Sequence, residues 1–253
     1  METLIDVASM AGIVLSITRV GAFVAASPVL RAFPVSGRMA YAFGIGLALA
    51  QPTTMPVTMS GFVVAMATNV GVGIVLGFLT GILLHAFEVA GSIIDLNSGL
   101  NASQIFDPLT GQSVSVFGRA FNLAAMTLWL VMGGDRLAIE GLAATTRVIP
   151  LDGALSFAPG LAETATTLVA QMLLAAVQLT IPTFAALLVA EVALGVASRF
   201  APQANVFALG LPAKLAAALA TVSLVVLAFP GAIDTSMSAT RDIVVTTVRG
   251  LGG

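Results

Sequence analysis

The stretch "MAYAFGIGLALAQPTTMPVTMSGFVVAMATNVGVGIVLGFLTGILL", residues 39–84, contains no aspartate, glutamate, lysine or arginine. Residues 164–190 and 215–233 are also free of charged side chains. A helix of roughly 18–20 apolar residues is long enough to cross the hydrocarbon core of a bilayer, and each of these stretches reaches that length. The sequence therefore predicts an all-α, polytopic membrane protein.

The composition supports the same class. Of the 253 residues, 58% are hydrophobic and 9% are charged, whereas an average soluble domain has about 25% charged residues. The net charge of −2 and the ten scattered basic residues form no basic stripe, so nucleic acid is not an expected partner. With no cysteine and one histidine, neither a disulfide framework, a Cys/His metal cluster nor a cofactor is predicted.

Prolines and glycines divide the chain into about six long hydrophobic helices. Pro28 is expected to end the first helix, Pro52 to follow the second, and Gly133 to break the chain after the fourth. The predicted helices cover residues 4–27, 35–50, 57–103, 114–132 and 164–199, and a sixth ends by Pro230. Because Glu2 and Asp6 stand where a signal peptide is basic, the first is expected to be a mature helix rather than a cleaved leader.

The connecting segments show no shift in composition that would mark a soluble domain, so a single domain is predicted. A more polar stretch at 135–163 is expected to contain a short amphipathic helix and a loop between Pro150 and Pro159. Residues 231–253 are expected to form a polar tail.

The long third helix combines two patterns. Gly73, Gly77 and Gly81 recur every four residues, which leaves a groove where another helix can approach closely. Further along, polar positions with spacings of three and four share one face; they are His85, Glu88, Ser92, Asp95 and Gly99. A charged group that faces lipid costs several kcal/mol, so this face is expected to meet protein or water.

Two loop segments carry turn signals. One contains Asp-Pro and Thr-Gly and consists of Ile105, Phe106, Asp107, Pro108, Leu109, Thr110, Gly111 and Gln112. The other is "SRFAPQANVFALGLPAKL", residues 198–215. As a hairpin turn, Pro202 would end one helix and Lys214 would extend its charge to the interface at the start of the next. Gln203 and Asn205 beside Phe207 make a mixed surface that suits a partner.

Enzymatic and transport chemistry find little support. The single histidine cannot supply a two-histidine zinc site, and no motif supports it as a base for a nucleophilic serine, so no catalytic residue is predicted. Glu88, Asp95 and Glu191 lie in or near apolar helices, where such groups often mark ion paths. A small-solute transporter therefore stays an alternative, although the second half of the chain does not repeat the first. A membrane scaffold is a third.

Three stretches, in order along nearly the whole chain, resemble the FliR family, the R subunits of the flagellar type III export gate. The first is "TRVGAFVAASPVLRAFPVSGRMAYAFGIGLALA", residues 18–50, with its arginine, its proline at the helix end and its basic turn. The second runs from "FEVAGSIIDLNSGL" through "IFDPLTGQSVSVFGR" to the leucine at 151. The third is "IPTFAALLVAEVALGVASRFAPQANVFALGLPAKL", residues 181–215.

The resemblance implies a role in protein export. One copy of an R subunit would join P and Q subunits (FliP and FliQ) in a ring of helix hairpins, the pore through which unfolded rod, hook and filament proteins leave the cytoplasm. Residues 1–160 would resemble a P subunit and residues 161–230 the hairpin of a Q subunit. The B and A subunits (FlhB and FlhA) would be further partners, and the location would be the inner membrane at the flagellar basal body.

The resemblance also implies roles for particular residues. Residues 105–112 would form a plug in the pore, and the turn of the C-terminal hairpin would face the cytoplasm near the B subunit. The residues expected in subunit packing are Gly73, Gly77, Gly81, Glu88, Asp95 and Glu191. Those expected at the hairpin turn are Arg199, Pro202, Gln203, Asn205, Phe207 and Lys214. An aspartate at position 95 also resembles the pattern of the virulence-secretion homologues, so the T subunit of an injectisome remains the alternative.

Overall fold

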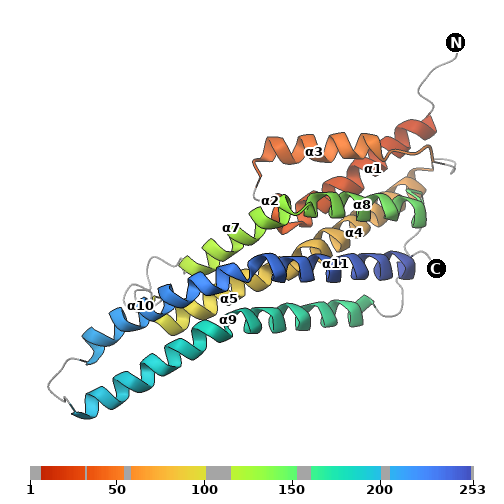
Figure 1. Cartoon of the computed structure of the whole chain (residues 1–253). Helices are drawn as coiled ribbons and strands as arrows, with labels where there is room; N and C mark the ends of the chain where they lie inside the picture. The colour runs from red at the N-terminus through yellow and green to blue at the C-terminus, as the bar shows by residue number, and fades with distance from the viewer. Residues whose placement is uncertain are drawn as a thin grey trace. The chain divides into compact units, whose positions relative to one another are not determined.

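The computed structural model describes residues 7–31, 33–53, 58–100, 115–152, 161–200 and 206–251. Within these residues the regular structure is entirely helical, as Figure 1 shows. The predicted all-α class is thereby confirmed. The elements are α1 (Val7–Ala26), α2 (Pro28–Arg31), α3 (Val35–Ala48), α4 (Met59–Gly81), a 3-10 turn η1 (Ile82–Leu84), α5 (His85–Ser98), α7 (Val116–Val131), α8 (Gly134–Val148), α9 (Leu161–Phe200), α10 (Val206–Leu227) and α11 (Phe229–Leu251).

Four stretches of helix in the described residues are long and apolar enough to cross a membrane. They are Ser9–Ala26, Met59–Ser98, Thr166–Phe200 and Gly210–Leu227, and α7 with α8 adds a fifth if the pair counts as one broken span. The predicted number of about six is therefore wrong. The predicted number included a helix at residues 35–50, next to the charge-free stretch 39–84. In the structure this helix is α3, which has only 14 residues. At 1.5 Å per residue α3 is about 21 Å long, short of the ~30 Å hydrocarbon core.

The predicted helix boundaries agree with the structure to within a few residues. The third predicted helix is one 40-residue stretch, Met59–Ser98, in which a 3-10 turn separates α4 from α5. The expected polar tail is instead a helix, α11, of 23 residues. Its polar and apolar residues alternate with a helical period that a search for apolar runs does not detect.

The chain forms two compact units. Unit 1 comprises Met1–Leu83, Gly133–Val169 and Met237–Gly253, and unit 2 comprises Leu84–Met132 and Ala170–Ser236. These units are defined by packing and do not test the predicted division at residues 160 and 230, which rests on likeness to P and Q subunits. That division stays a prediction.

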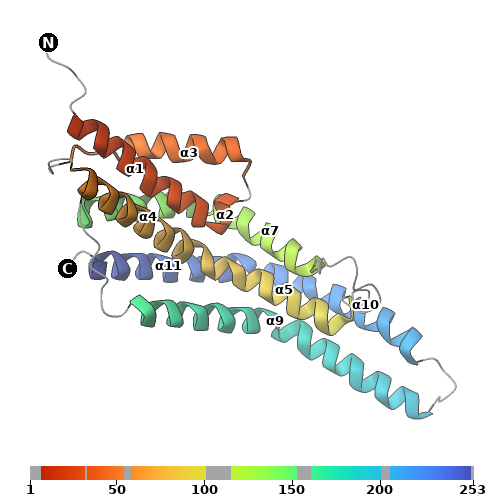
Figure 2. The same cartoon turned by 180° about the vertical axis from the view of Figure 1, so that it is seen from behind.

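In unit 1, α4 lies along α1 (Figures 1 and 2). Gly73, Gly77 and Gly81 make this approach possible, because a Cβ atom on any of them would clash with α1 or with Pro28. The helix in the predicted groove is thus one of this chain's own, so the groove is filled within the chain. Subunit contact through these glycines stays a prediction that this packing does not favour.

In unit 2, α5 lies along α7 (Figure 2). Gly91 allows this contact, because a Cβ atom there would clash with the backbone of Phe117 and Gly118. Nearby, Phe229 meets Phe87 and Phe121 edge to face, with ring centroids 4.9 and 5.0 Å apart. Such aromatic pairs contribute about 0.5–1.5 kcal/mol beyond the burial of their area. The core of unit 2 therefore fixes α5 against α7, and the polar groups described next lie along that contact.

Candidate functional site

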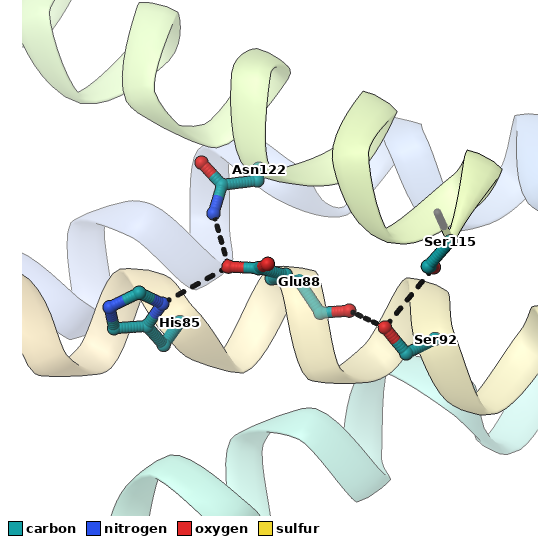
Figure 3. Close-up of polar contacts among 5 residues, drawn as sticks. All are labelled: His85, Glu88, Ser92, Ser115 and Asn122. Atoms are coloured by element: carbon teal, nitrogen blue, oxygen red, sulfur yellow. Dashed lines mark hydrogen bonds and ion pairs between the residues drawn. The ribbon is translucent and has the colours of Figure 1, made fainter. Parts of the chain in front are cut away.

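The polar face predicted on α5 meets α7. We call this contact the α5–α7 seam and define it by Glu88, Ser92 and Asp95 on α5 and by Ser115 and Asn122 on α7 or directly before it. All but Asp95 appear in Figure 3, which shows the α5 side chains pointing toward α7. The α5 residues could be predicted from the sequence, because their spacing repeats with the helical period. Ser115 and Asn122 are isolated polar residues, so no periodic pattern indicates them.

Asp95 is the buried end of the seam, with no exposed surface. Its carboxylate accepts a hydrogen bond from the Ser115 hydroxyl. It also accepts from the backbone N–H of Phe117, whose nitrogen is 3.0 Å from Oδ2 and 3.3 Å from Oδ1. The first N–H groups of a helix have no partner inside the helix and carry partial positive charge. Asp95 therefore caps the N-terminus of α7 from the neighbouring helix.

Ser115, directly before α7, links α7 to α5. Its hydroxyl accepts from the Gly118 amide at 2.9 Å, which makes it the N-cap of α7, and Ser92 Oγ lies 3.1 Å away as a further partner (Figure 3). A serine hydroxyl has one donor and two acceptor positions, so Ser115 donates its one proton to Asp95 while it accepts from Gly118. Sequence reasoning missed Ser115, although serine before an apolar run is a typical N-cap signal.

Glu88 is the open end of the seam. Asn122 Nδ2 donates to Glu88 Oε2 at 2.6 Å, and His85 Nδ1 lies 3.1 Å from the same oxygen (Figure 3). The side chains of His85 and Glu88 are 41% and 47% exposed. One end of the seam is thus the buried carboxylate of Asp95, and the other is the partly exposed carboxylate of Glu88, which water or a partner can contact.

The predicted plug residues 105–112 lie outside the described residues. The segment that contains them follows α5, whose C-cap is Gly99 with a φ of 82°, and precedes α7. The seam therefore holds together the two helices between which this segment is placed in the chain.

The C-terminal hairpin is represented by its two helices. Lys214 Nζ donates to Glu191 Oε1 at 2.9 Å and links α10 to α9, so Glu191 has a partner within the chain. Arg199 is exposed in the last turn of α9. Of the predicted turn residues, Pro202, Gln203 and Asn205 lie outside the described residues, and Phe207 is described only as part of helix α10.

Unit 1 contains a second buried polar group that was not predicted as a site. Arg19 in α1 is fully buried. Its Nε donates to Asn69 Oδ1 at 2.8 Å and its Nη2 to the Ile149 carbonyl at 3.0 Å. Thr145 Oγ1 lies 3.4 Å from Nη1. Arg19 therefore ties α1 to α4 and to the C-terminal end of α8, where the helix dipole favours a cation.

The α5–α7 seam and the hydrogen bonds of Arg19 both hold neighbouring helices in place. Among the described residues, no group of three or more His, Cys, Asp or Glu side chains could hold a metal ion. Asp95 and Ser115 use their hydrogen-bonding capacity on each other and on the start of α7. The seam can hold helices in register, and its exposed end can contact a polar partner.

Comparison with known proteins matches residues 10–240 to the family model described as bacterial export proteins, family 1. The chain is 27% identical over 228 residues to the flagellar biosynthetic protein FliR of Bacillus subtilis, with 85% of each chain covered. It is 30% identical over 203 residues to FliR of Escherichia coli, with 78% of this chain and 77% of FliR covered.

A second kind of relative aligns over a shorter stretch. The surface presentation of antigens protein SpaR of Shigella sonnei is 36% identical over 149 residues, which is 59% of this chain and 57% of SpaR. The expected resemblance to FliR-type proteins is confirmed over most of the length, and the chain belongs to the bacterial export proteins, family 1.

Proposed function

We propose that this membrane protein is the R-type core subunit of a flagellar type III export gate. In this role one copy joins P and Q subunits, FliP and FliQ, around a pore for unfolded rod, hook and filament proteins at the basal body. Family membership and the FliR relatives, which align over 77–85% of their length, support an export role. The structural observation that carries the proposal is the capping of α7 by Asp95, because it fixes both helices that flank residues 105–112.

A gate subunit has to let a polypeptide pass without leaking ions. In the proposed mechanism, residues 105–112 block the pore at rest and move aside for the exported chain. The α5–α7 seam holds the ends of this segment in place, because Asp95 and Ser115 bond the last turns of α5 to the first turn of α7. The partly exposed Glu88 and His85 would offer a polar surface to the passing polypeptide or to a neighbouring subunit.

The plug is tested in the assembled complex. Residues 105–112 are deleted in the chain co-expressed with the P and Q subunits, and membrane conductance for small ions is measured. The deletion is expected to raise the conductance while the complex still assembles. The matched control replaces the eight residues 153–160, between α8 and α9, by a Gly–Ser linker and is expected to leave the membrane tight. Unchanged conductance in an intact complex would rule out the plug.

The proposed partners are tested by native mass spectrometry of the chain purified after co-expression. The expected species contains one copy of this chain with several copies of two other short hydrophobic proteins, whereas a monomer or simple dimer contradicts the gate. Alanine at Gln203 and Asn205 is expected to weaken recovery of the complex more than it lowers the amount of chain in the membrane. FlhB and FlhA are the further proteins expected to copurify.

The alternatives predict different outcomes. A small-solute transporter would be active as the purified chain alone in liposomes, and a scaffold would leave both permeability and secretion unchanged by loop substitutions. The T subunit of an injectisome is favoured by the higher identity to SpaR over the shorter aligned stretch. Complementation separates the last alternative: restored motility in a strain without FliR supports the flagellar assignment, and restored secretion only in a strain without SpaR supports the injectisome.

A further inference from the structure

A groove of about 350 Å³ lies between α8 and α11 in unit 1. Its apolar lining comes from Leu137, Ala144 and Val148 on α8 and from Val244 and Val245 on α11. Gly141 on α8 faces Val244 on α11, since a Cβ atom there would be 3.0 Å from Val244 Cγ1. The volume is at the lower end of the ~300–1,000 Å³ typical of ligand pockets, too small for a folded partner but large enough for a slender apolar ligand.

The shape and the setting of the groove favour an acyl chain. Its lining on α8 extends from residue 137 to residue 148, which is about 16 Å at 1.5 Å per residue. This length matches the ~15 Å that one leaflet contributes to the hydrocarbon core. Outside the groove, α8 carries the exposed Asp135, Arg136 and Arg147, so charged side chains flank the apolar lining.

The charges at the groove favour an anionic head group. Arg241 lines the groove and is exposed, and no described residue accepts a hydrogen bond or forms an ion pair with it. The one carboxylate in the lining, Glu140, is already engaged by Arg136 Nε at 3.0 Å. The lining therefore has one carboxylate, which is paired, and one arginine, Arg241, which is not. An unpaired arginine beside an apolar groove can bind the phosphate of an anionic lipid.

We propose that the α8–α11 groove binds an anionic phospholipid, with one acyl chain along Leu137, Ala144 and Val148 and the head-group phosphate on Arg241. The site is separate from the α5–α7 seam and does not depend on the proposed export function. It would let the composition of the membrane affect how firmly α11 is held against α8.

The test uses the full chain purified in mild detergent, with native mass spectrometry to count bound lipid. Phosphatidylglycerol and phosphatidylcholine with identical acyl chains are compared. One basic residue near a membrane surface contributes ~1 kcal/mol to the binding of an anionic head group, so wild type is expected to prefer phosphatidylglycerol about fivefold. Arg241→Gln is expected to abolish the preference. Arg147→Gln, which removes an exposed arginine of α8 outside the groove, is expected to keep it.

A groove-filling variant tests the acyl chain separately. Ala144→Phe is expected to lower binding of both lipids severalfold, while its melting temperature shows whether the chain stays folded. A preference that survives Arg241→Gln, or lipid binding that survives Ala144→Phe, overturns the proposal. A photoreactive amino acid at Val148, on the groove rim, identifies the occupant in cells. An adduct with the mass of a phospholipid supports the proposal, whereas an adduct with a polypeptide assigns the groove to a protein partner instead.

Discussion

Arg19 places a positive charge inside unit 1 where the partners that the structure describes are neutral oxygens. They come from Asn69 on α4, from Thr145 on α8 and from the Ile149 and Pro150 carbonyls at the end of α8. Asn69 is held in turn, because its Nδ2 donates to the Ala65 and Leu151 carbonyls at 2.7 Å each. Three segments far apart in the sequence thus share one hydrogen-bond network.

Substitution Arg19→Met is expected to destabilise the chain by about 2 kcal/mol. The methionine fills part of the volume, but the Asn69 oxygen and the Ile149 carbonyl lose their donor, and an unsatisfied buried acceptor costs ~1–3 kcal/mol. Removal of the desolvated charge offsets part of this loss. Thermal unfolding of the purified chain in detergent measures the effect. Arg147→Met, at an exposed position of α8, should stay within about 0.5 kcal/mol of wild type. Equal losses in both variants would contradict the network.

Tyr41, the only tyrosine in the chain, offers a spectroscopic probe of α3. Burial and, secondarily, the nearby charge of Asp135 raise the pKa of Tyr41 from 10.0 to about 12, since both disfavour the phenolate. The tyrosinate absorbance of the folded chain is therefore expected to develop near pH 12. The folded form keeps the proton longer than the unfolded form, so this stabilising contribution is complete below pH 10 and is lost between pH 10 and pH 12.

Asp135→Asn is the matched variant for the tyrosine titration. It removes the electrostatic contribution and keeps the burial, so the pKa of Tyr41 should fall only part of the way toward 10. Arg136→Gln, next in sequence and exposed, serves as the control. A titration near pH 10 in wild type would contradict the buried position of the ring.

Residues of this kind mark the limit of sequence-based prediction. The polar face of α5 could be predicted, because five polar or small positions repeat with the helical period. Asn122 and the side-chain partners of Arg19 could not, because each is a single polar residue whose importance depends on which helix packs against it. Ser115 has the sequence signal of an N-cap, but its bond to Asp95 depends on the packing of α5. Periodicity indicates a face but not the residues opposite it.

At the scale of single elements, helix packing rests on small residues at a few positions. Gly77→Ala in α4 is expected to destabilise the chain by ~1–3 kcal/mol, the usual cost of overpacking, because the new methyl group would meet Ala26 Cβ and the Phe23 carbonyl of α1. Gly21→Ala in α1 has no atom within 4 Å of the new Cβ and should be neutral or stabilising by up to ~1 kcal/mol. Melting temperatures that rank the two variants in the opposite order would contradict the α1–α4 contact.

The capping of α7 by Asp95 is tested by amide hydrogen exchange. Asp95→Ala removes the acceptor of the Phe117 N–H, and loss of a charged cap costs ~1–2 kcal/mol. The Phe117 amide is therefore expected to exchange about tenfold faster, while the middle of α7 is much less affected. Thr127→Val, which removes a hydroxyl bonded only within α7, is the control. Unchanged exchange at Phe117 would show that Asp95 does not hold the helix start.

The elements themselves were predictable to different degrees. Long apolar runs and their proline or glycine ends located α1, α4, α7, α9 and α10, because a membrane helix needs about 18 apolar residues and leaves a strong compositional signal. Helix α11 was predicted as a tail, since a helix with one polar face resembles a polar segment when only composition is considered. Helix α3 was counted among the long hydrophobic helices because it has little charge, although its predicted extent, residues 35–50, is already shorter than the roughly 18–20 residues that a membrane span needs.

At the scale of the whole molecule, much apolar surface of the described helices is exposed. In the span Gly210–Leu227 only 11% of the residues are buried, and in an 18-residue apolar window of Thr166–Phe200 only 28%. Either lipid or other protein subunits must cover these faces. The number of membrane spans cannot decide between the two, since a helix shielded by neighbouring subunits has the same composition as one in lipid.

The proposed export complex predicts which of the two covers α10. Leu224 is 60% exposed, and its neighbour Val225 is 2% exposed, so the two positions form a matched pair on one turn of helix. A photoreactive amino acid at Leu224 is expected to link the chain to another short hydrophobic protein when the complex is co-expressed. At Val225 the probe should react only within the chain. If Leu224 instead forms adducts with lipid alone in the co-expressed complex, α10 faces the bilayer and the proposed contact with Q subunits through this face is wrong.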